Sequence, residues 1–345
     1  MSTYIIGEIG QNHNGSVDLA KAIIDLISRP PIDELFGTEL QPINAVKLTK
    51  RDLEEELTKS AMNKPYDSIN SFGRTYGEHR AFLELSFEEH YEIYLHAKSK
   101  NLDVIETLCS IKTLDILNHF TPDQLKVASR DLTNLPLLDA MAKTQIPMIL
   151  STGMAGQREL DQAISTICKH HSNLSILHCL SQYPAEHRRL NLRTISFLIE
   201  NYPEFTIGYS DHSIGIMIPT AAIALGAKII EKHVTIDRFM KGTDQKGSLG
   251  PDGVRRMVRD IRILEQSLGE EEIFLDDAAE AARIKLERSL ATNKSLSKGH
   301  RINESDLCLL SPGDGVKWSE SNLLIGKTLK KDIKKSEIIY LTDIE

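Results

Sequence analysis

The sequence contains few cysteines, and their spacing shows no pairing. The four cysteines are Cys109, Cys168, Cys179 and Cys308, and most of them lie inside apolar runs. Isolated thiols of this kind are typical of reduced, buried cysteines in a cytosolic protein rather than of disulfides. A nucleophilic role for Cys109 or Cys179 is the alternative.

Long apolar runs and blocks of basic residues are also missing. No stretch approaches the ~18 consecutive apolar residues typical of a membrane-spanning helix. The first three residues lead directly into strand-like sequence, without the pattern of a signal peptide. Because the formal net charge is −8, neither nucleic acid nor an anionic membrane is an expected partner. We expect a cytoplasmic protein that holds any anionic substrate with a few local Lys, Arg and backbone N–H groups.

Most of the chain alternates short apolar strands with helical patterns. One helix opens with the capping box Ser86-Phe87-Glu88-Glu89. We predict strands at residues 4–10, 44–49, 103–107, 124–129, 147–151, 174–179, 207–209 and 228–230. Eight strands that alternate with helices predict an α/β fold, namely a closed (β/α)8 barrel of the TIM type.

The length of 345 residues exceeds the ~250–300 residues of a usual single core, so a second domain is expected. We place the barrel at residues 1–268, an acidic linker at 269–287 and a small β-rich module at 288–345. The core of this module is too small to be very stable alone. Docking on a barrel is the simplest way for it to bury more surface.

Two connections in the barrel are longer than simple turns. Residues 28–42 contain three prolines and little periodicity, which indicates a surface insertion. Residues 51–79 form a long connection that we interpret as irregular. A connection of this length is rarely passive, so we expect it to overhang a site.

Polar residues recur at the carboxyl ends of the predicted strands, the edge where such barrels place their chemistry. They are Glu8, Lys47, Thr107, Lys126, Ser129, Ser151, Tyr183, His212 and His233. Glu8 alone also indicates a functional site, because burial of a carboxylate inside an apolar strand is costly unless the group is paired or functional. A salt-bridged core glutamate is the alternative reading.

His212 and His233 follow two strands joined by an apolar segment, residues 216–226, that has the pattern of a buried helix. If these strands are parallel neighbours, both histidines leave the sheet at the same edge. Their imidazoles can then converge on one metal ion. Two separate, hydrogen-bonded histidines at strand ends remain the alternative.

Several motifs resemble one family in order along nearly the whole chain. They read GEIGQNHNG, AVKL, GRTYGEHR, KVASRDLTNLPLL, ILSTGM, LHCLSQYP, GYSDHS and ALGAKIIEKHVTID, followed by the tail at residues 288–345. Together they are similar to the sialic acid synthases, which are phosphoenolpyruvate-dependent N-acetylneuraminate synthases with a C-terminal antifreeze-like (SAF) domain.

This resemblance implies that phosphoenolpyruvate condenses with a hexose such as N-acetylmannosamine, giving a nine-carbon 2-keto-3-deoxy acid and phosphate. It also implies a divalent ion between His212 and His233, usually Mn²⁺, with Mg²⁺ and Co²⁺ as alternatives. The ion would polarise the open-chain sugar aldehyde for attack by C3 of phosphoenolpyruvate. A domain-swapped homodimer is a further implication, in which each SAF domain covers the partner's barrel mouth.

The resemblance also implies roles for single residues. Glu8, His212 and His233 are the expected catalytic residues. Glu8 would position a hydroxyl or transfer a proton, and Thr49 and Asp244 lie on the sugar side. The phosphate and carboxylate of phosphoenolpyruvate would be held by Lys47, Thr107, Lys126, Ser129, Ser151, Ser181 and Tyr183.

The chain departs from the family pattern at five positions. Ser181 stands where many members have Asn, and Thr49 where Gln is usual. Arg130 replaces a glycine, Gln245 a common histidine and Ser311 a common arginine before Pro-Gly. Since most of these changes touch the sugar half of the site, we expect retained phosphoenolpyruvate chemistry with a shifted acceptor sugar.

Three other functions remain open at this point. One is another barrel enzyme that uses phosphoenolpyruvate, such as a keto-deoxy sugar-phosphate synthase. A barrel aldolase of the Schiff-base type would use Lys47 or Lys126 as its nucleophile. A diverged, inactive sugar-binding or assembly protein would explain Arg130 and Ser311.

Overall fold

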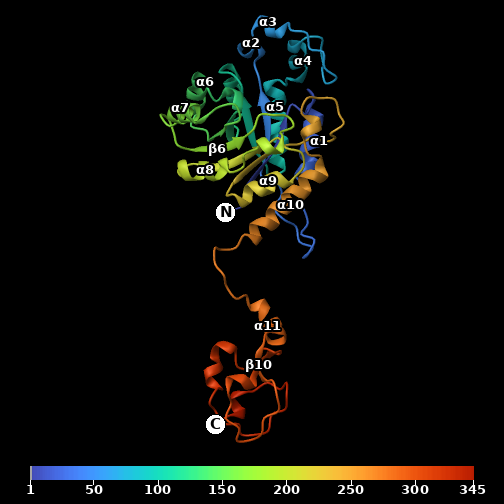
Figure 1. The fold of residues 1–345 in the computed structure, drawn as a ribbon. Helices are drawn as coiled ribbons and strands as arrows, with labels where there is room; N and C mark the ends of the chain where they lie inside the picture. Colours follow the sequence, from blue (N-terminus) through green and yellow to red (C-terminus); the bar gives the residue numbers. More distant parts are fainter. Residues whose placement is uncertain (1) are drawn as a thin grey trace. The chain divides into compact units, whose positions relative to one another are not determined.

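The computed structural model describes residues 2–345, and the chain divides into two compact units after Gly269. The first unit is a closed barrel of eight parallel strands in sequential order (Figure 1). Its strands are β1 (Tyr4–Gly10), β2 (Ala45–Lys50), β3 (Asp103–Leu108), β4 (Gln124–Val127), β5 (Met148–Ser151), β6 (Leu174–Cys179), β7 (Thr206–Asp211) and β8 (Ile229–His233). Since β1 pairs with both β2 and β8, the predicted barrel is confirmed.

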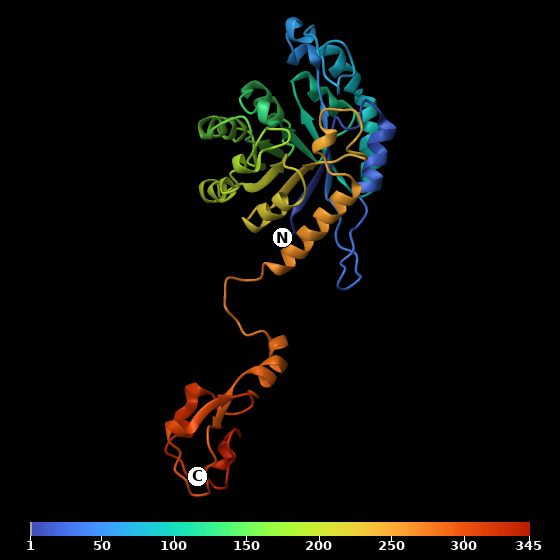
Figure 2. The ribbon, with the colours of Figure 1, turned by 45° about the vertical axis from the view of Figure 1, so that its right-hand side comes forward.

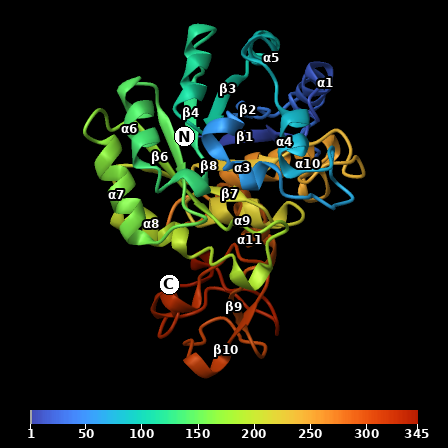
Figure 3. The ribbon, with the colours of Figure 1, turned by 90° about the horizontal axis from the view of Figure 1, so that it is seen from above.

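Helices surround these strands, as the view from above shows (Figure 3). They are α1 (Val17–Ile27), α5 (Phe87–Ser99), α6 (Leu135–Lys143), α7 (Gln157–Ile167), α8 (Thr194–Asn201), α9 (Met217–Ala224) and α10 (Pro251–Ser267). The long helix α10 packs against both α1 and α9 (Figure 2). Among the described residues, no helix combines the length and apolar character needed to cross a membrane.

Local sequence signals account for several helix boundaries. Ser86 caps α5 by accepting from the Glu89 backbone N–H, and Glu89 reciprocates, so the predicted capping box is confirmed. The connection between β3 and β4 contains a 3-10 helix, Lys112–Asn118, in place of an α-helix. Thr113, Ile116 and Asn118 have a weaker helix propensity than Ala or Leu. A short 3-10 helix at this place is consistent with that composition.

The connection at residues 51–79 is less irregular than we predicted. It contains the four-residue helices α2 (Leu53–Glu56) and α3 (Lys59–Met62) and leads into α4 (Tyr76–Leu83). Asp52 and Thr58 cap the two short helices by accepting from backbone N–H groups. Helices this short depend on caps and tertiary contacts rather than on apolar periodicity, so the periodicity did not reveal them.

The second unit, Glu270–Glu345, contains the helix α11 (Glu280–Leu286) and a small antiparallel sheet of β9 (Ser289–Thr292) and β10 (Leu307–Leu310). An isolated antiparallel bridge between Ala291 of β9 and Ile338 extends this sheet. Its own apolar core consists of Leu290, Leu296, Ile302, Leu307, Val316, Leu324, Leu329, Ile333, Ile339 and Ile344.

Asp306 is a buried carboxylate in this second unit, with 1% of its surface exposed. It pairs with Lys294 at 2.7 Å and His300 at 2.8 Å and accepts from the Asn303 N–H at 2.9 Å. Burial alone would raise the pKa of Asp306, but these partners outweigh it and hold the pKa well below the ordinary value. A depressed carboxylate pKa stabilises the folded state above the unfolded pKa, and this stability is lost as the pH falls through the folded pKa.

We therefore expect Asp306→Asn to destabilise this unit by about 1–3 kcal/mol at pH 7, and by progressively less as the medium is acidified below pH 4. Hydrogen exchange of the β9 and β10 amides, read by mass spectrometry in the full chain, measures this locally. Glu320→Gln is the control, because Glu320 is exposed. An equal loss of protection at pH 7 and at pH 3 would contradict the assignment.

Candidate functional site

The alternation of side chains along the strands places an apolar layer beneath a polar layer inside the barrel. Ile6, Ala45, Ile105, Ile149, Leu177 and Ile229 form the apolar layer. Two residues further along their strands lie Glu8, Lys47, Thr107, Ser151, Cys179 and Glu231. Since a strand repeats every two residues, these polar groups point to the same interior, toward the carboxyl ends of the strands.

A cavity of about 430 Å³ opens at this end of the barrel. It is lined by every residue that the sequence predicted for the site: Glu8, Lys47, Thr49, Thr107, Lys126, Ser129, Ser151, Ser181, Tyr183, His212, His233 and Asp244. These residues come from six of the eight strands and from the loops that follow β4, β6, β7 and β8. The structure thus brings the whole predicted set together, at the edge of the barrel where we expected it.

Two buried lysines and two buried carboxylates form the floor of the cavity. The Lys47 ammonium lies 2.6 Å from Glu8 and 3.8 Å from Glu231, and it donates to the Thr107 hydroxyl at 3.0 Å. The Lys126 ammonium lies 3.9 Å from Glu231 and donates to the Ser151 hydroxyl at 2.7 Å. Ammonium and hydroxyl donors gathered in a largely dry site can bind a phosphate or carboxylate.

The two floor carboxylates have pKa values that are shifted in opposite directions. Burial, and then the negative charge of Glu231, raise the pKa of Glu8 to about 7 against the opposing effect of Lys47. Burial also acts to raise the pKa of Glu231, but Lys126 and Lys47 outweigh it and lower that pKa to about 2. Two interacting carboxylates separated in this way can supply one proton donor and one fixed negative charge.

His212 and His233 face each other across the cavity, with ring centroids 5.4 Å apart. Nδ1 of His212 lies 2.8 Å from the Leu180 carbonyl, which fixes the proton on Nδ1 and leaves Nε2 free as a ligand. Nδ1 of His233 is buried without a hydrogen-bond partner, and burial lowers the pKa of this ring to about 4, so it is neutral at pH 7. Burial acts to lower the pKa of His212, but the Cys179 thiol and the Leu180 carbonyl outweigh it and raise this pKa. Two imidazoles this close together can hold a divalent transition ion once both rings are neutral.

Within residues 2–345, no group of three or more His, Cys, Asp and Glu side chains is arranged to hold a metal. Such an ion would therefore have two protein ligands, and its remaining positions would be free for water and substrate. Open positions of this kind are a property of catalytic rather than structural metal sites.

Around the mouth of the cavity lie the remaining predicted residues. The Ser129 hydroxyl accepts from the Gly153 N–H at 3.0 Å, and a Cβ at residue 153 would collide with the hydroxyls of Ser129 and Ser181. The Tyr183 ring lies 4.0 Å from the His212 ring, between centroids. Glycine at position 153 thus allows two predicted phosphate-binding hydroxyls to approach the same point.

The cysteines agree only in part with the expectation of buried thiols. Cys109 and Cys179 are buried, whereas Cys308 is half-buried and Cys168 is exposed. Cys168 ends helix α7, and its exposure shows that this part of the apolar run faces outward. Burial raises the pKa of Cys109 to about 11, which makes this thiol a poor nucleophile near neutral pH.

Several cavity-lining residues were missed by the sequence reasoning. Glu231 is the most prominent, because it lies between the two floor lysines and accepts from the Ser210 hydroxyl at 2.9 Å. The signal that identified Glu8, a carboxylate in an apolar strand, applies equally to Glu231. Gln11, Arg51 and Arg80 also line the cavity, and no pattern within their own segments indicates it.

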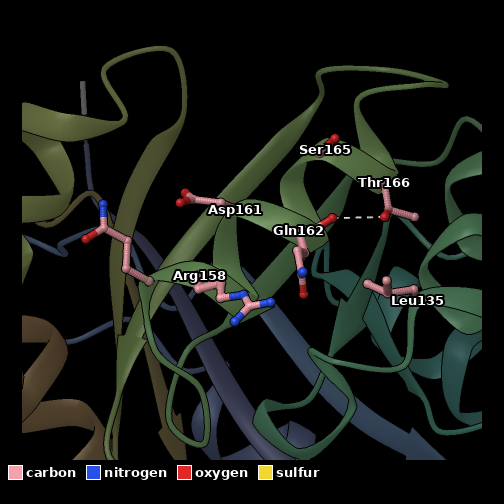
Figure 4. A pocket seen from close by; sticks show the side chains of 7 residues that line it. Leu135, Arg158, Asp161, Gln162, Ser165 and Thr166 are labelled. Carbon is pink, nitrogen blue, oxygen red and sulfur yellow. Dashed lines mark hydrogen bonds between the residues drawn. The ribbon is translucent and has the colours of Figure 1, made fainter.

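A second depression, of about 720 Å³, lies on the outside of the barrel (Figure 4). It is lined by Leu135 at the start of α6 and by residues of α7, including Arg158 and Asp161, and it is open to solvent. The predicted site residues are all elsewhere, in the barrel mouth. We therefore assign the chemistry to the barrel mouth.

Comparisons with known proteins agree with this geometry. The model of the NeuB family matches residues 40–273, and that of the SAF domain matches residues 287–345. The N,N'-diacetyllegionaminic acid synthase of Legionella pneumophila is 33% identical, over 100% of this chain and 95% of its own length. The N-acetylneuraminate-9-phosphate synthase of Drosophila melanogaster is 31% identical, over 98% of this chain and 95% of its own.

Among solved structures, a sialic acid synthetase from Leptospira borgpetersenii serovar Hardjo-bovis, in complex with citrate, has a TM-score of 0.68 and 31% identity. The match covers 82% of this chain and 90% of that chain. The NeuB match spans β2 to β8, with both floor lysines and the imidazole pair, and the SAF match spans most of the small C-terminal unit. This chain therefore belongs to the NeuB family and carries a C-terminal SAF domain.

Proposed function

We propose that the chain condenses phosphoenolpyruvate with an open-chain hexose related to N-acetylmannosamine, forming a nine-carbon 2-keto-3-deoxy acid and phosphate. One observation carries the proposal: two buried lysines and a facing pair of imidazoles line the same cavity. The relatives described above, synthases of N-acetylneuraminate 9-phosphate and N,N'-diacetyllegionaminic acid, support a reaction of this type.

The floor of the cavity is suited to phosphoenolpyruvate. Lys47 and Lys126 supply positive charge, and the hydroxyls of Thr107 and Ser151 lie next to their ammonium groups. Because the chain as a whole carries a net charge of −8, the attraction for this anion has to be local. The Ser129 and Ser181 hydroxyls meet at Gly153 and extend the donor surface toward the mouth.

His212 and His233 would hold the divalent ion, Mn²⁺ in the first instance. Bound there, the ion supplies Lewis acidity that makes the aldehyde carbon of the acceptor more electrophilic. The Leu180 carbonyl keeps the His212 ring in the tautomer that leaves Nε2 free. These two rings therefore determine where the aldehyde end of the acceptor lies.

Glu8 and Glu231 have different roles in the proposed reaction: Glu8 supplies a proton, and Glu231 supplies a fixed negative charge. When C3 of phosphoenolpyruvate attacks the aldehyde carbon, the aldehyde oxygen becomes an alkoxide that needs a proton. Glu8, with a pKa near 7, is protonated in part at neutral pH and can supply it or bind a hydroxyl. Glu231 stays ionised and stabilises positive charge that develops at C2, where water then adds before the tetrahedral adduct loses phosphate.

The acceptor is expected to lie between the imidazole pair and the mouth, where Thr49 and Asp244 line the cavity. Gln245, which replaces a common histidine, is buried and donates to the Asn12 carbonyl at 3.0 Å, so it shapes the loop and does not line the cavity. In the assembled protein, we propose that the SAF domain of a second copy covers the mouth, forming a domain-swapped homodimer. Exposed apolar side chains on the loops of the mouth, Met154, Ile214 and Phe239, support such a cover.

A Schiff-base aldolase is the main alternative, and one experiment separates the two. Lys126 has the lowered pKa that an imine-forming lysine needs, and burial is the first cause of it. We expect pyruvate and borohydride to leave the mass of the full chain unchanged. With phosphoenolpyruvate, Mn²⁺ and a suitable hexose, the product mass should instead equal acceptor plus pyruvate. A reduced adduct on Lys47 or Lys126 would contradict the proposal.

A further inference from the structure

Three arginines line the cavity and have no role in the reaction as described so far. Arg51 and Arg130 each lie four positions after a floor lysine, Lys47 and Lys126 respectively, and so stand further toward the mouth. Arg80 comes from α4 and reaches the same side of the cavity, where it donates to the Gln11 side chain. We call Arg51, Arg80 and Arg130 the arginine arc.

The carboxylates that pair with the arginine arc lie behind it. Glu56 Oε2 accepts from Arg51 at 2.9 Å and lies 3.2 Å from the Arg130 guanidinium, and Arg130 Nε lies 3.1 Å from Asp131. The arginines line the cavity, whereas Glu56 and Asp131 do not. Nε of Arg51 is buried without a hydrogen-bond partner. A ligand in the cavity therefore meets guanidinium donors first.

Arg80 adds positive charge that the protein leaves uncompensated locally. It donates to the Tyr76 hydroxyl at 2.9 Å and lies 5.0 Å from the centroid of the Tyr76 ring. Within residues 2–345 its guanidinium forms no ion pair with a carboxylate. Asp244 is the one acidic residue on this outer part of the lining, since Glu8 and Glu231 belong to the floor. Glu84, which lies 3.9 Å from Arg51 Nε, is also outside the lining. The lining of the mouth therefore presents three guanidinium groups and one carboxylate.

We propose that the arginine arc binds a phosphate monoester on the acceptor sugar, at the end remote from its aldehyde, so that the chain uses a hexosamine phosphate rather than the neutral sugar. This inference rests on the proposed function. The aldehyde has to meet C3 of phosphoenolpyruvate beside the imidazole pair, near the floor. The other end of a six-carbon chain then extends toward the mouth, where guanidinium forks match the geometry of phosphate.

The position of the arc separates this role from binding of phosphoenolpyruvate. The floor already provides two ammonium groups and several hydroxyls for that anion. Arg51 instead lies two positions after Thr49, and Arg80 donates to the Gln11 side chain, and Thr49 and Gln11 both line the cavity. An arginine at position 130 therefore acts on the part of the site that distinguishes one acceptor from another.

The first test compares N-acetylmannosamine with its 6-phosphate as acceptors for the full-length protein, at fixed ionic strength and saturating phosphoenolpyruvate. We expect kcat/KM to be higher for the phosphate by about 10- to 100-fold, as for charge-assisted hydrogen bonds to one anion. Calorimetric binding of each sugar without phosphoenolpyruvate provides a readout that does not depend on turnover. Equal kcat/KM and equal affinity for the two sugars would overturn the inference while leaving the proposed function intact.

The second test uses two substitutions that predict opposite effects. Arg130→Gly should raise KM for the phosphorylated acceptor by about tenfold, without a comparable rise in KM for phosphoenolpyruvate or a comparable loss of kcat/KM for the neutral sugar. Glu56→Gln removes the carboxylate shared by Arg51 and Arg130. It should therefore maintain or lower KM for the phosphorylated acceptor, because the guanidinium groups lose a competing anion.

A purely structural role of Arg130, in which it ties α2 to the loop after β4, predicts equal losses in Arg130→Gly and Glu56→Gln. That result would overturn the inference, as would a rise in KM for phosphoenolpyruvate in Arg130→Gly. If neither sugar leads to release of phosphate from phosphoenolpyruvate, that result counts against the proposed function. The affinity of the phosphorylated sugar, and its loss in Arg130→Gly, would still decide whether the arc is a phosphate site.

Discussion

Replacing Lys126 with methionine lowers kcat/KM for phosphoenolpyruvate by about three orders of magnitude in our account. The Lys126 ammonium is buried, donates to Ser151 at 2.7 Å and lies 3.9 Å from the ionised Glu231. Methionine removes one cation from the phosphate site and leaves Glu231 with less compensation. Truncation of one partner of a buried, hydrogen-bonded charge pair between a protein and its ligand costs about 2–5 kcal/mol of binding, and every ~1.4 kcal/mol is a factor of ten.

Steady-state measurement of phosphate release tests this prediction. The KM values for phosphoenolpyruvate and for the acceptor are measured separately. Lys143→Met is the matched control, because Lys143 lies on α6 with its side chain 62% exposed and pairs with Asp139. The control should retain wild-type values. If Lys126→Met keeps its affinity for phosphoenolpyruvate and loses affinity for the sugar, Lys126 belongs to the acceptor site and our assignment is wrong.

Replacing His233 with asparagine is expected to remove Mn²⁺ binding and, with it, activity. His233 is one of only two imidazoles that face each other in the cavity, so its loss halves the protein ligands available to the ion. The affinity for Mn²⁺ should fall by more than the ~10- to 100-fold that follows loss of a group hydrogen-bonded to a ligand. Electron paramagnetic resonance of free Mn²⁺ during titration measures this directly.

His178→Asn is the control for this substitution. His178 is also a buried histidine at the end of a barrel strand, but its ring bonds to the Leu190 carbonyl at 2.7 Å and does not line the cavity. It should bind Mn²⁺ like the wild type even if it is less stable. Equal affinities in His233→Asn and the wild type would show that the ion, if bound at all, lies elsewhere.

The strand-end residues could be predicted from the sequence because local physics determines their position. Glu8 and Lys47 stand in short apolar strands, and parallel strands of a barrel bring their carboxyl ends to one edge. The two-residue repeat of β8 also explains the failure at Glu231. Residues 231 and 233 point into the barrel, whereas Lys232 between them is buried outside it and pairs with Asp211 at 2.5 Å. The predicted strand ends at residue 230, so the alternation is not followed through residues 231–233.

The arginine arc could not be predicted in the same way. Arg51 and Arg80 belong to a long connection whose path depends on capping residues and on contacts such as that between Arg80 and Gln11, 69 positions apart. No periodicity in this segment indicates which side chains turn toward the barrel. Arg130 was visible as a departure from the family pattern, but its neighbours in space, Arg51 and Glu56, come from a different loop.

Release of inorganic phosphate from phosphoenolpyruvate tests the central claim most directly. With Mn²⁺ present, our account predicts that the full chain releases one phosphate for each molecule of nine-carbon acid formed, and that omission of the acceptor or of the metal stops both. It also predicts that bridging ¹⁸O in phosphoenolpyruvate leaves with the phosphate, because water attacks C2. Phosphate release that proceeds equally without any hexose or hexose phosphate, or an absence of release with every such acceptor tried, would contradict the account.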